Sequence, residues 1–416
     1  MSLREEIEIL CSDAKAASAK LALCDTNKKN EALERIALFL EREKEKIIEA
    51  NVRDLSAAEE NGVPKAMLDR LTINEERIAG ICASLRDLCG LEDPVGRSES
   101  WSRPSGLEIS RVRVPLGVVA IIYEARPNVT VDSAALCLKT GNAVVLRGGK
   151  EAINTNTAIV EVIKDALVDC DMDPHSVELI RSTERESANI LMTMRGYIDV
   201  LIPRGGKGLI RNVVENATVP VIETGAGNCH LYVDEYADLS MALKVAINAK
   251  CSRPSVCNAV ETLLVHASIA SKFLPELGRE MKARGVELRG CPRTCVLIPE
   301  VVRASEEDYV TEFNDYILAV KVVDTLTDAI NHINAYSTGH SEAIITENGE
   351  NSERFLREIN SAAVYVNAST RFTDGGEFGF GAEIGISTQK LHVRGPMGLF
   401  ALTTEKYMIR GEGAVR

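Results

Sequence analysis

The chain contains 416 residues, 45% of them hydrophobic, and carries a formal net charge of -13 at pH 7. A chain of this length can bury a large core and exceeds one ordinary domain, so we expect two or three folded units. The acidic balance, without any basic tail or stripe, argues against nucleic acid as a partner.

The amino terminus and the cysteines bear on location. The opening MSLREEIEILCSDAKAASAKL is charged from its fourth residue and lacks an apolar signal core. Apolar runs such as VPLGVVAIIY fall short of the roughly 18 residues that span a bilayer. Eleven cysteines without a secretion signal favour reduced thiols. The sequence contains neither a Cys-x-x-Cys nor a His-x-x-x-His pair, the patterns that would suggest a metal site. We therefore expect a cytoplasmic protein without a membrane span or a metal.

The first part of the chain is predicted to be helical and the next to alternate strands with helices. Between about residues 4 and 90, Leu33, Ile36, Ala37 and Leu40 form an apolar stripe of helical spacing. Beyond Trp101, strand-like runs alternate with helical stretches, which predicts a parallel sheet covered by helices. These runs are VVAIIY (118–123), AVVL (143–146), VELI (177–180), DVLIP (199–203) and VPVIE (219–223).

A second alternating series begins near His230 and predicts a second sheet. Its strands are expected to be LYV (231–233), VETLLV (260–265), TCVLIP (294–299), LAVKVV (318–323), EAIIT (342–346) and AAVYVN (362–367). The chain therefore divides most naturally into two doubly wound α/β domains that meet near residue 228. The segment 371–394 is rich in glycine and charge, which is typical of a functional loop.

Four segments, taken in order, resemble the aldehyde dehydrogenase superfamily: PLGVVAIIYEARPN, TGNAVVLRGGKEA, VIETGAGNCH and SVCNAVETLLVH. Two more, HINAYSTGHSEAIIT and the run from AAVYVNASTRFTDGG to LFALTTEKY, resemble the branch of that superfamily that reduces an acyl phosphate. Together the segments cover essentially the whole chain.

The resemblance implies an aldehyde dehydrogenase-like α/β fold with two Rossmann-like domains and a small β arm. The cofactor-binding domain would comprise residues 1–100 and 116–227 with part of 375–396, the catalytic domain 228–374, and the oligomerisation arm 101–115 and 397–416. Because such arms pair as strands across subunits, we expect a homodimer or a homotetramer.

Two residues are candidates for the chemistry. Cys257 precedes an apolar strand, where a free cysteine can be either a nucleophile or a small buried hydrophobe. The resemblance places Cys257 at the superfamily's nucleophile position and Asn128 at the position of the asparagine that helps hold an oxyanion. Taken alone, Asn128 would be a turn residue after proline.

The resemblance also implies a nicotinamide cofactor. Glu312 aligns with a glutamate that binds the nicotinamide ribose, and Gly205 and Gly206 lie in a loop that resembles the superfamily's diphosphate-binding turn. Glu223 aligns with a glutamate that activates water in oxidising relatives, but a phosphate-releasing enzyme needs no such water, so we assign it to the lining of this site. Arg147 and Lys150 follow a strand where NAD-preferring relatives place a glutamate, and these cations favour NADPH.

The implied substrate carries a phosphate, an α-carboxylate and an α-amino group, and its pocket therefore needs both cations and an acid. The candidates are Ser369, Thr370 and Arg371 for the carboxylate, Arg126 and Arg253 for the phosphate, and Glu124 for the ammonium group. Each of these charged residues could equally form a surface salt bridge.

The implied activity is NADPH-dependent reduction of γ-glutamyl phosphate to glutamate 5-semialdehyde through a cysteine thioester, as a step of proline synthesis, and a separate glutamate 5-kinase is a candidate partner. Two alternatives stay open. One is an oxidising semialdehyde dehydrogenase of the same superfamily, and the other is an oligomeric scaffold that has lost activity.

Overall fold

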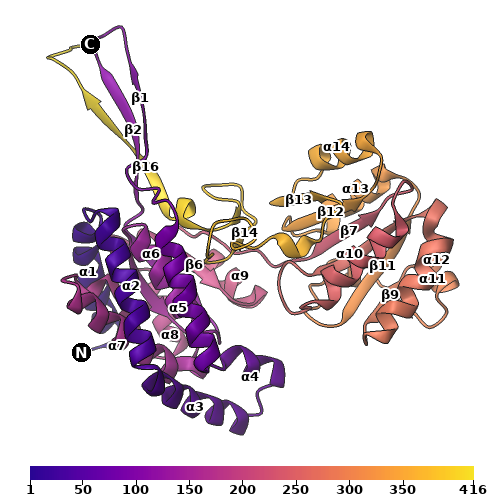
Figure 1. The fold of residues 1–416 in the computed structure, drawn as a ribbon, viewed down its shortest axis with the longest axis horizontal. Helices are drawn as coiled ribbons and strands as arrows, with labels where there is room; N and C mark the ends of the chain where they lie inside the picture. Colours follow the sequence, from indigo (N-terminus) through magenta and orange to yellow (C-terminus); the bar gives the residue numbers. More distant parts are fainter. The chain divides into compact units, whose positions relative to one another are not determined.

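The computed structural model describes residues 1–64 and 67–416, and the chain divides into two compact units (Figure 1). Unit 1 comprises Met1–Glu223, Gly379–Gly385 and Met397–Arg416. Unit 2 comprises Thr224–Phe378 and Ile386–Pro396. The late segments return to unit 1 after the chain has built unit 2, so each unit is closed by residues distant in sequence.

Unit 1 opens with a helical region, as predicted from the apolar spacing. Ser2 and Glu5 form a capping box at the first helix, and the Asp25 side chain accepts the Lys28 N–H at the second, which satisfies otherwise unpaired helical donors. The five helices are α1 (Leu3–Leu21), α2 (Thr26–Arg42), α3 (Lys44–Glu60), α4 (Lys65–Leu71) and α5 (Glu75–Gly90).

A four-stranded parallel sheet of order β5-β4-β3-β6 forms the centre of unit 1. Its strands are β3 (Val118–Tyr123), β4 (Ala143–Arg147), β5 (Val177–Leu179) and β6 (Val200–Arg204). The strands are followed in turn by the helices α6 (Pro127–Lys139), α7 (Ile153–Asp169), α8 (Arg185–Leu191) and α9 (Lys207–Asn216). β3 is buried along its whole length, which explains its continuous apolar run.

The strand predicted at 219–223 is wrong. Val221 forms only an isolated bridge with Leu201, flanked by hydrogen bonds from Leu201 N to Pro220 O and from Ile222 N to Leu201 O. Proline carries no N–H to donate, so the run cannot extend into a regular ladder.

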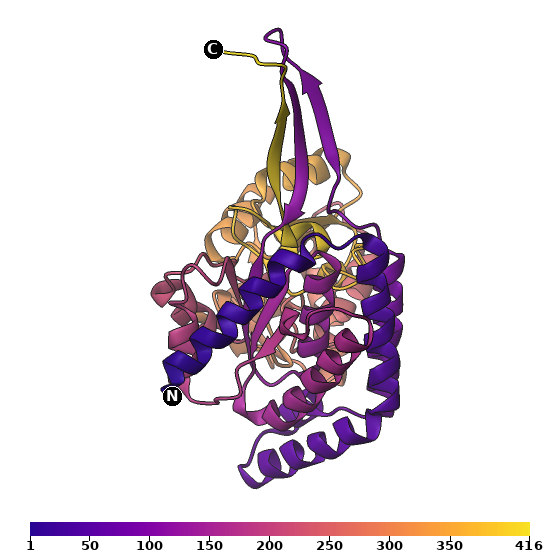
Figure 2. The same ribbon diagram turned by 90° about the vertical axis from the view of Figure 1, so that its left-hand side faces the viewer.

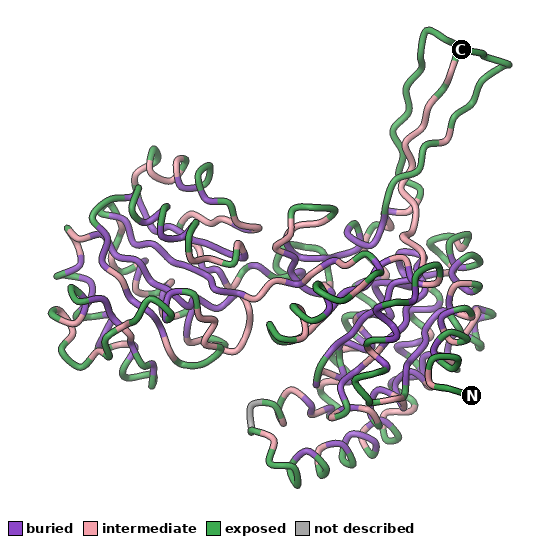
Figure 3. The backbone as a smooth tube through the Cα atoms, turned by 180° about the vertical axis from the view of Figure 1, so that it is seen from behind, coloured by how far each residue is buried: buried purple, intermediate pink, exposed green. Residues whose placement is uncertain are grey.

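An arm of three antiparallel strands projects from the helices and sheet of unit 1 (Figure 2). β1 (Ser98–Ser102) and β16 (Thr403–Arg410) flank β2 (Glu108–Pro115). The arm is largely exposed or half-buried (Figure 3), and Trp101 packs edge-on against Tyr407 at 6.3 Å between ring centroids. The expected β arm is therefore present, and its role in oligomerisation stays a prediction.

Unit 2 is built on a seven-stranded sheet in which all pairs are parallel, in the order β10-β9-β11-β8-β7-β12-β13. The strands are β7 (Cys229–Val233), β8 (Val260–His266), β9 (Glu287–Gly290), β10 (Val302–Arg303), β11 (Ile317–Val323), β12 (Ser341–Ile345) and β13 (Ala363–Val366). The helices are α10 (Leu239–Cys251), α11 (Ala267–Ala283), α12 (Pro292–Leu297), α13 (Leu326–Tyr336) and α14 (Gly349–Glu358).

The strand predicted at 294–299 is also wrong, because those residues begin within helix α12. Pro292 stands at the first helical position, where its fixed φ and missing N–H favour a helix start. The strand of this region is β9, just before the proline, whose charged residues Glu287 and Arg289 alternate with buried Leu288 and Gly290. A short run with two charges did not stand out as a strand in the sequence.

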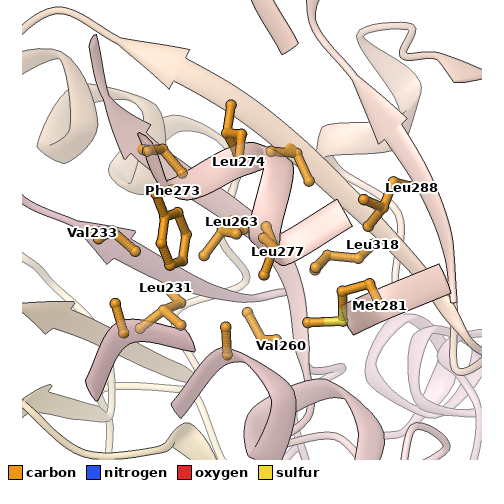
Figure 4. Packing of buried hydrophobic residues seen from close by; sticks show 14 of the residues in the cluster. Leu231, Val233, Val260, Leu263, Phe273, Leu274, Leu277, Met281, Leu288 and Leu318 are labelled. Atoms are coloured by element: carbon orange, nitrogen blue, oxygen red, sulfur yellow. The ribbon is translucent and has the colours of Figure 1, made fainter. Parts of the chain in front are cut away.

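One buried apolar cluster of unit 2 lies between its sheet and helices α10 and α11 (Figure 4), and another packs the sheet against α13 and α14. Phe273 and Leu277 of α11 lie near Leu231 of β7 and Leu263 of β8, and all four are buried. This apolar layer fixes the strands whose amino ends carry polar residues.

No helix among the described residues is long and apolar enough to span a bilayer.

Replacing Phe273 by alanine should destabilise unit 2 by about 3 to 5 kcal/mol, because a fully packed ring is lost and a cavity remains. Thermal and urea unfolding of the full chain would measure the loss. Val296→Ala is the matched control, since Val296 is 79% exposed and should change stability by less than about 0.5 kcal/mol. Equal effects of the two substitutions would contradict the packing described here.

Candidate active site

The amino ends of the strands of unit 2 gather several reactive side chains. Cys257 lies three residues before β8, Cys229 begins β7, and His340 immediately precedes β12. Because these strands are parallel, their starting points share one edge of the sheet. Cys229 Sγ donates to the Cys257 carbonyl at 3.1 Å and lies 3.7 Å from His340 Nδ1. Burial raises the pKa of Cys229 well above its usual value, so Cys229 is a neutral thiol beneath the loop.

Gly227 is the point at which this loop meets another chain segment. A Cβ added to Gly227 would lie 1.5 Å from the Cys257 carbonyl oxygen and 2.7 Å from its Cα, so no side chain fits. The Gly227 N–H donates to Glu312 Oε1 at 2.8 Å. One glycine therefore joins the Cys257 loop to the carboxylate that the sequence predicted for the cofactor ribose.

Asn258 ties the Cys257 loop to the segment 369–373, and the sequence alone did not identify it. Its Nδ2 donates to the carbonyls of Arg371, at 3.2 Å, and Thr373, at 2.9 Å. Arg371 Nη1 donates to Asn258 Oδ1, and Thr370 Oγ1 donates to the Asn258 carbonyl. A polar residue directly after the candidate nucleophile and before a buried strand was the available signal.

Arg371 is a cation near Cys257 whose guanidinium group is held by hydrogen bonds to Ser252 and Asn258. Its Nε donates to Ser252 Oγ at 3.0 Å, and its N–H donates to Ser369 Oγ at 3.3 Å. Burial lowers the pKa of Arg371, and the charge of Arg253 lowers it further, while Asp374 and Cys257 oppose the change. Ser369, Thr370, Arg371 and Arg253 are thus grouped around the candidate nucleophile.

In unit 1, Asn128 stands in the first turn of α6, directly after Pro127. Its side chain is exposed, and Nδ2 donates to Asp132 Oδ2 one turn later at 3.1 Å. Burial raises the pKa of Asp132 to about 6, although the bond from Asn128 and the charge of Arg204 act against the rise. Asp132 therefore orients the Asn128 amide, a contact that only helical i, i+4 spacing could have suggested.

Glu124 and the glycine turn of unit 1 lie together, although the sequence assigned them to different ligands. Glu124 Oε2 accepts the Gly206 N–H at 3.0 Å, at the amino end of α9. A Cβ at Gly205 would lie 2.6 Å from the Glu124 carboxylate carbon. The carboxylate thus occupies the position where a helix terminus favours an anion.

Arg147 and Lys150 differ in their contacts. Arg147 Nη2 donates to the carbonyls of Thr183 and Glu184 at 2.9 and 3.0 Å, and Nε donates to Ser187 Oγ. Burial lowers the pKa of Arg147, while the charge of Glu151 raises it. Lys150 is exposed at the start of the short helix that follows β4, and is the cation better placed to meet a ligand.

The two remaining predicted residues lie at the ends of elements. Arg126 is the half-buried residue that caps α6, next to Pro127. Glu223 is half-buried and is the last residue of unit 1 before the chain enters unit 2. Within the described residues, no three His, Cys, Asp or Glu side chains form a group that could hold a metal ion.

Comparison with known proteins agrees with this fold and arrangement. The model of the aldehyde dehydrogenase family matches residues 2–289 and 298–384, so the fold class is that of the aldehyde dehydrogenases. The γ-glutamyl phosphate reductase of Carboxydothermus hydrogenoformans is 58% identical over 413 residues, which cover 99% of this chain and all of that protein. That of Moorella thermoacetica is 57% identical over 417 residues, with both chains fully covered.

A solved structure gives the same result. The crystal structure of γ-glutamyl phosphate reductase from Thermotoga maritima superposes with a TM-score of 0.95 at 51% identity, covering 98% of this chain and 99% of that chain. The chain therefore belongs to the γ-glutamyl phosphate reductases within the aldehyde dehydrogenase family.

Gly227→Ala should disable the site, because the new methyl group must push the backbone carbonyl of Cys257 away, which costs at least about 1 to 3 kcal/mol. The rate at which iodoacetamide alkylates Cys257 should change, and turnover should fall. Gly80→Ala is the control, because Gly80 lies in α5 with no atom near its added Cβ. An unchanged alkylation rate and turnover in Gly227→Ala would refute the close approach.

Proposed function

We propose that the protein reduces γ-glutamyl phosphate to glutamate 5-semialdehyde with NADPH and releases phosphate. The observation that carries this proposal is the position of Cys257, which is linked through Gly227 to Glu312 and through Asn258 to Arg371. The loop that carries Cys257 thus lies next to a carboxylate suited to a cofactor ribose and a cation suited to an anionic substrate. The similarity to γ-glutamyl phosphate reductases over nearly the full chain supports the same activity.

In the proposed reaction the Cys257 thiolate attacks the γ-acyl carbon and forms a C–S bond. The acyl C–O bond breaks, and phosphate leaves with its electron pair. When bound, NADPH supplies the hydride that the thioester carbon accepts. Collapse of the tetrahedral adduct breaks the C–S bond, returns the electron pair to Cys257 Sγ and releases the aldehyde. No water needs activation, which leaves Glu223 without a general-base role.

Stabilisation of the oxyanion is assigned to Asn128 and to the backbone N–H of Cys257. Each such donor contributes about 3 to 4 kcal/mol in other enzymes, provided that it is oriented before the charge develops. Asp132 supplies this orientation for Asn128, because it holds one hydrogen of Nδ2. The second hydrogen of the same amide is then available for the substrate oxygen.

The cofactor is assigned to residues whose chemistry fits its parts. Glu312 has one oxygen on Gly227 N–H, and its second oxygen can accept from a ribose hydroxyl. Gly205 and Gly206 border the amino end of α9, where diphosphate would replace the Glu124 carboxylate that now accepts the Gly206 N–H. Exposed Lys150 suits the 2′-phosphate of NADPH.

The substrate is assigned to the cations near Cys257 and to one acid. Arg371, with Ser369 and Thr370, suits the α-carboxylate, and Arg253 suits the phosphate. We assign Arg126 to the phosphate as well. Glu124 has Oε2 on the Gly206 N–H, and its Oε1 can accept from the ammonium group.

The proposed setting is proline synthesis in the cytoplasm, with a separate glutamate 5-kinase as the source of the acyl phosphate. We further propose a homodimer or homotetramer joined through the arm. The arm supports this because β1 and β16 are edge strands that carry exposed Trp101, Tyr407 and Ile409. Unpaired edges with exposed apolar residues tend to pair with another chain.

The proposed function is tested most directly in reverse, with glutamate 5-semialdehyde, NADP and phosphate. NADPH should form only when phosphate is present, because phosphate is the group that must cleave the thioester. Formation of NADPH at the same rate without phosphate would identify an oxidising semialdehyde dehydrogenase instead. Absence of any reaction would favour the inactive scaffold.

Cys257→Ser should abolish turnover in this assay and leave NADPH binding unchanged, since a hydroxyl is a much weaker nucleophile than a thiolate at neutral pH. Cys251→Ser is the control, because Cys251 ends α10 and its Sγ contacts Met281 Sδ at 3.9 Å. That variant should stay active. More than a small fraction of wild-type activity in Cys257→Ser would rule out the thioester.

Lys150→Glu should weaken NADPH binding by at least about tenfold and spare NADH, because one charge-assisted contact is replaced by repulsion. Binding constants for both cofactors would be measured by the change in dinucleotide fluorescence. Lys272→Glu, on α11, changes the net charge equally and should affect neither cofactor. Equal losses for NADPH and NADH would show that Lys150 does not read the 2′-phosphate.

A further inference from the structure

A fully buried ion pair of unit 2 contacts the turn that follows the candidate cofactor carboxylate. Lys250, in the last turn of α10, and Glu261, in β8, have no exposed side-chain surface, and Nζ lies 2.5 Å from Oε2. Two apolar side chains of similar volume would often stabilise the interior as well as or better than such a pair. Stability alone therefore does not account for it.

The second oxygen of Glu261 holds a turn. Glu261 Oε1 accepts the Asn314 N–H at 3.1 Å, and Asn314 has a φ of 55°. Asparagine tolerates this left-handed conformation better than other residues except glycine, and the bond to Glu261 holds the turn in it. A bond from a backbone N–H to a carboxylate is charge-assisted and is about twice as strong as a neutral one.

The turn at Asn314 carries Glu312 two residues earlier, whose Oε1 accepts the Gly227 N–H. The two carboxylates lie within electrostatic reach of each other. Burial raises the pKa of Glu261 to about 7, and the charge of Glu312 adds to the rise, while Lys250 and the Asn314 N–H act against it. Lys250 and the Asn314 N–H therefore favour the ionised form of Glu261, which burial and Glu312 disfavour.

We propose that Lys250 and Glu261 are positioning residues for the cofactor: by holding the turn at Asn314, they fix Glu312 so that one oxygen grips Gly227 and the other faces the ribose. This inference rests on the proposed function. A contiguous route of contacts carries it, from Lys250 through Glu261, Asn314 and Glu312 to Gly227, which lies against Cys257.

The decisive variant replaces both charges at once, Lys250→Met with Glu261→Leu. No unpaired charge is left in the core, so the protein should fold with a thermal midpoint close to that of the wild type. The full-length variant should bind NADPH at least about fivefold more weakly, because Asn314 loses its acceptor and the turn relaxes. The rate at which iodoacetamide alkylates Cys257 in the absence of cofactor should stay unchanged.

A control variant treats another buried pair in the same way. Lys29 and Asp93 in unit 1 are 2% and 5% exposed, and Asp93 also accepts a backbone N–H, from Val95. Lys29→Met with Asp93→Leu should leave NADPH affinity at the wild-type value. An equal loss of affinity in both double variants would reduce Lys250 and Glu261 to a general structural role and overturn the inference.

A double-mutant cycle tests whether the pair acts through Glu312. In a Glu312→Gln background, removing the Lys250–Glu261 pair should cause less than about a twofold further loss of NADPH affinity, because residues that act as one unit are not additive. A full additional loss would overturn the inference.

Asn314→Val provides a second route if the core variant fails to fold. Asn314 is exposed, and a β-branched residue is strongly disfavoured at positive φ, so the turn shifts while the buried pair stays intact. NADPH affinity should fall about as far as in the core variant. Unchanged affinity would overturn the inference. Wild-type protein that neither binds NADPH nor shows phosphate-dependent turnover would refute the proposed function itself.

Discussion

The close approach of Gly227 to Cys257 is the constraint on which the arrangement of unit 2 depends. With 1.5 Å between the place of a Cβ and the Cys257 carbonyl oxygen, only glycine can stand there. Its N–H is then free to hold Glu312, and the same edge of the sheet brings Cys229 beneath the loop. The carboxylate and the thiol are therefore positioned by backbone packing, before any ligand contributes.

That constraint also shows what the sequence could and could not reveal. Cys257 and Glu312 were predicted because the segments around them resemble a known superfamily, and the sheets were predicted because parallel strands read as continuous apolar runs. Gly227 and Asn258 were missed because their roles arise from contacts with residues distant in sequence. Gly227 packs against Cys257, and Asn258 bonds to Arg371. The strand expected at 294–299 failed because a proline at a helix start outweighs an apolar run.

In unit 1, a carboxylate of the chain itself is already bonded to the turn that we propose for the cofactor diphosphate. Its displacement adds a step to the proposed cofactor binding. Glu124 accepts the Gly206 N–H at the start of α9, so a diphosphate bound there as proposed would displace a carboxylate of the same chain. The exchange of one anion for another at a helix terminus conserves the hydrogen bond and avoids leaving the N–H unpaired. The same displacement would free Glu124 for another partner, which would link the two roles that the sequence assigned separately.

Because the protein is acidic overall, the attraction of an anionic substrate depends on cations close to the site. The net charge of -13 repels anions at long range, but physiological salt screens charges beyond about 8 Å. Close to Cys257, Arg253 and Arg371 are near enough for one to lower the pKa of the other. Arg371 is half-buried and Arg253 is exposed, and their like charges repel each other, a repulsion that Asp374 partly offsets. If these residues bind the substrate as proposed, an acyl phosphate or a carboxylate would relieve that repulsion, and the relief would add to affinity for an anion beside Cys257.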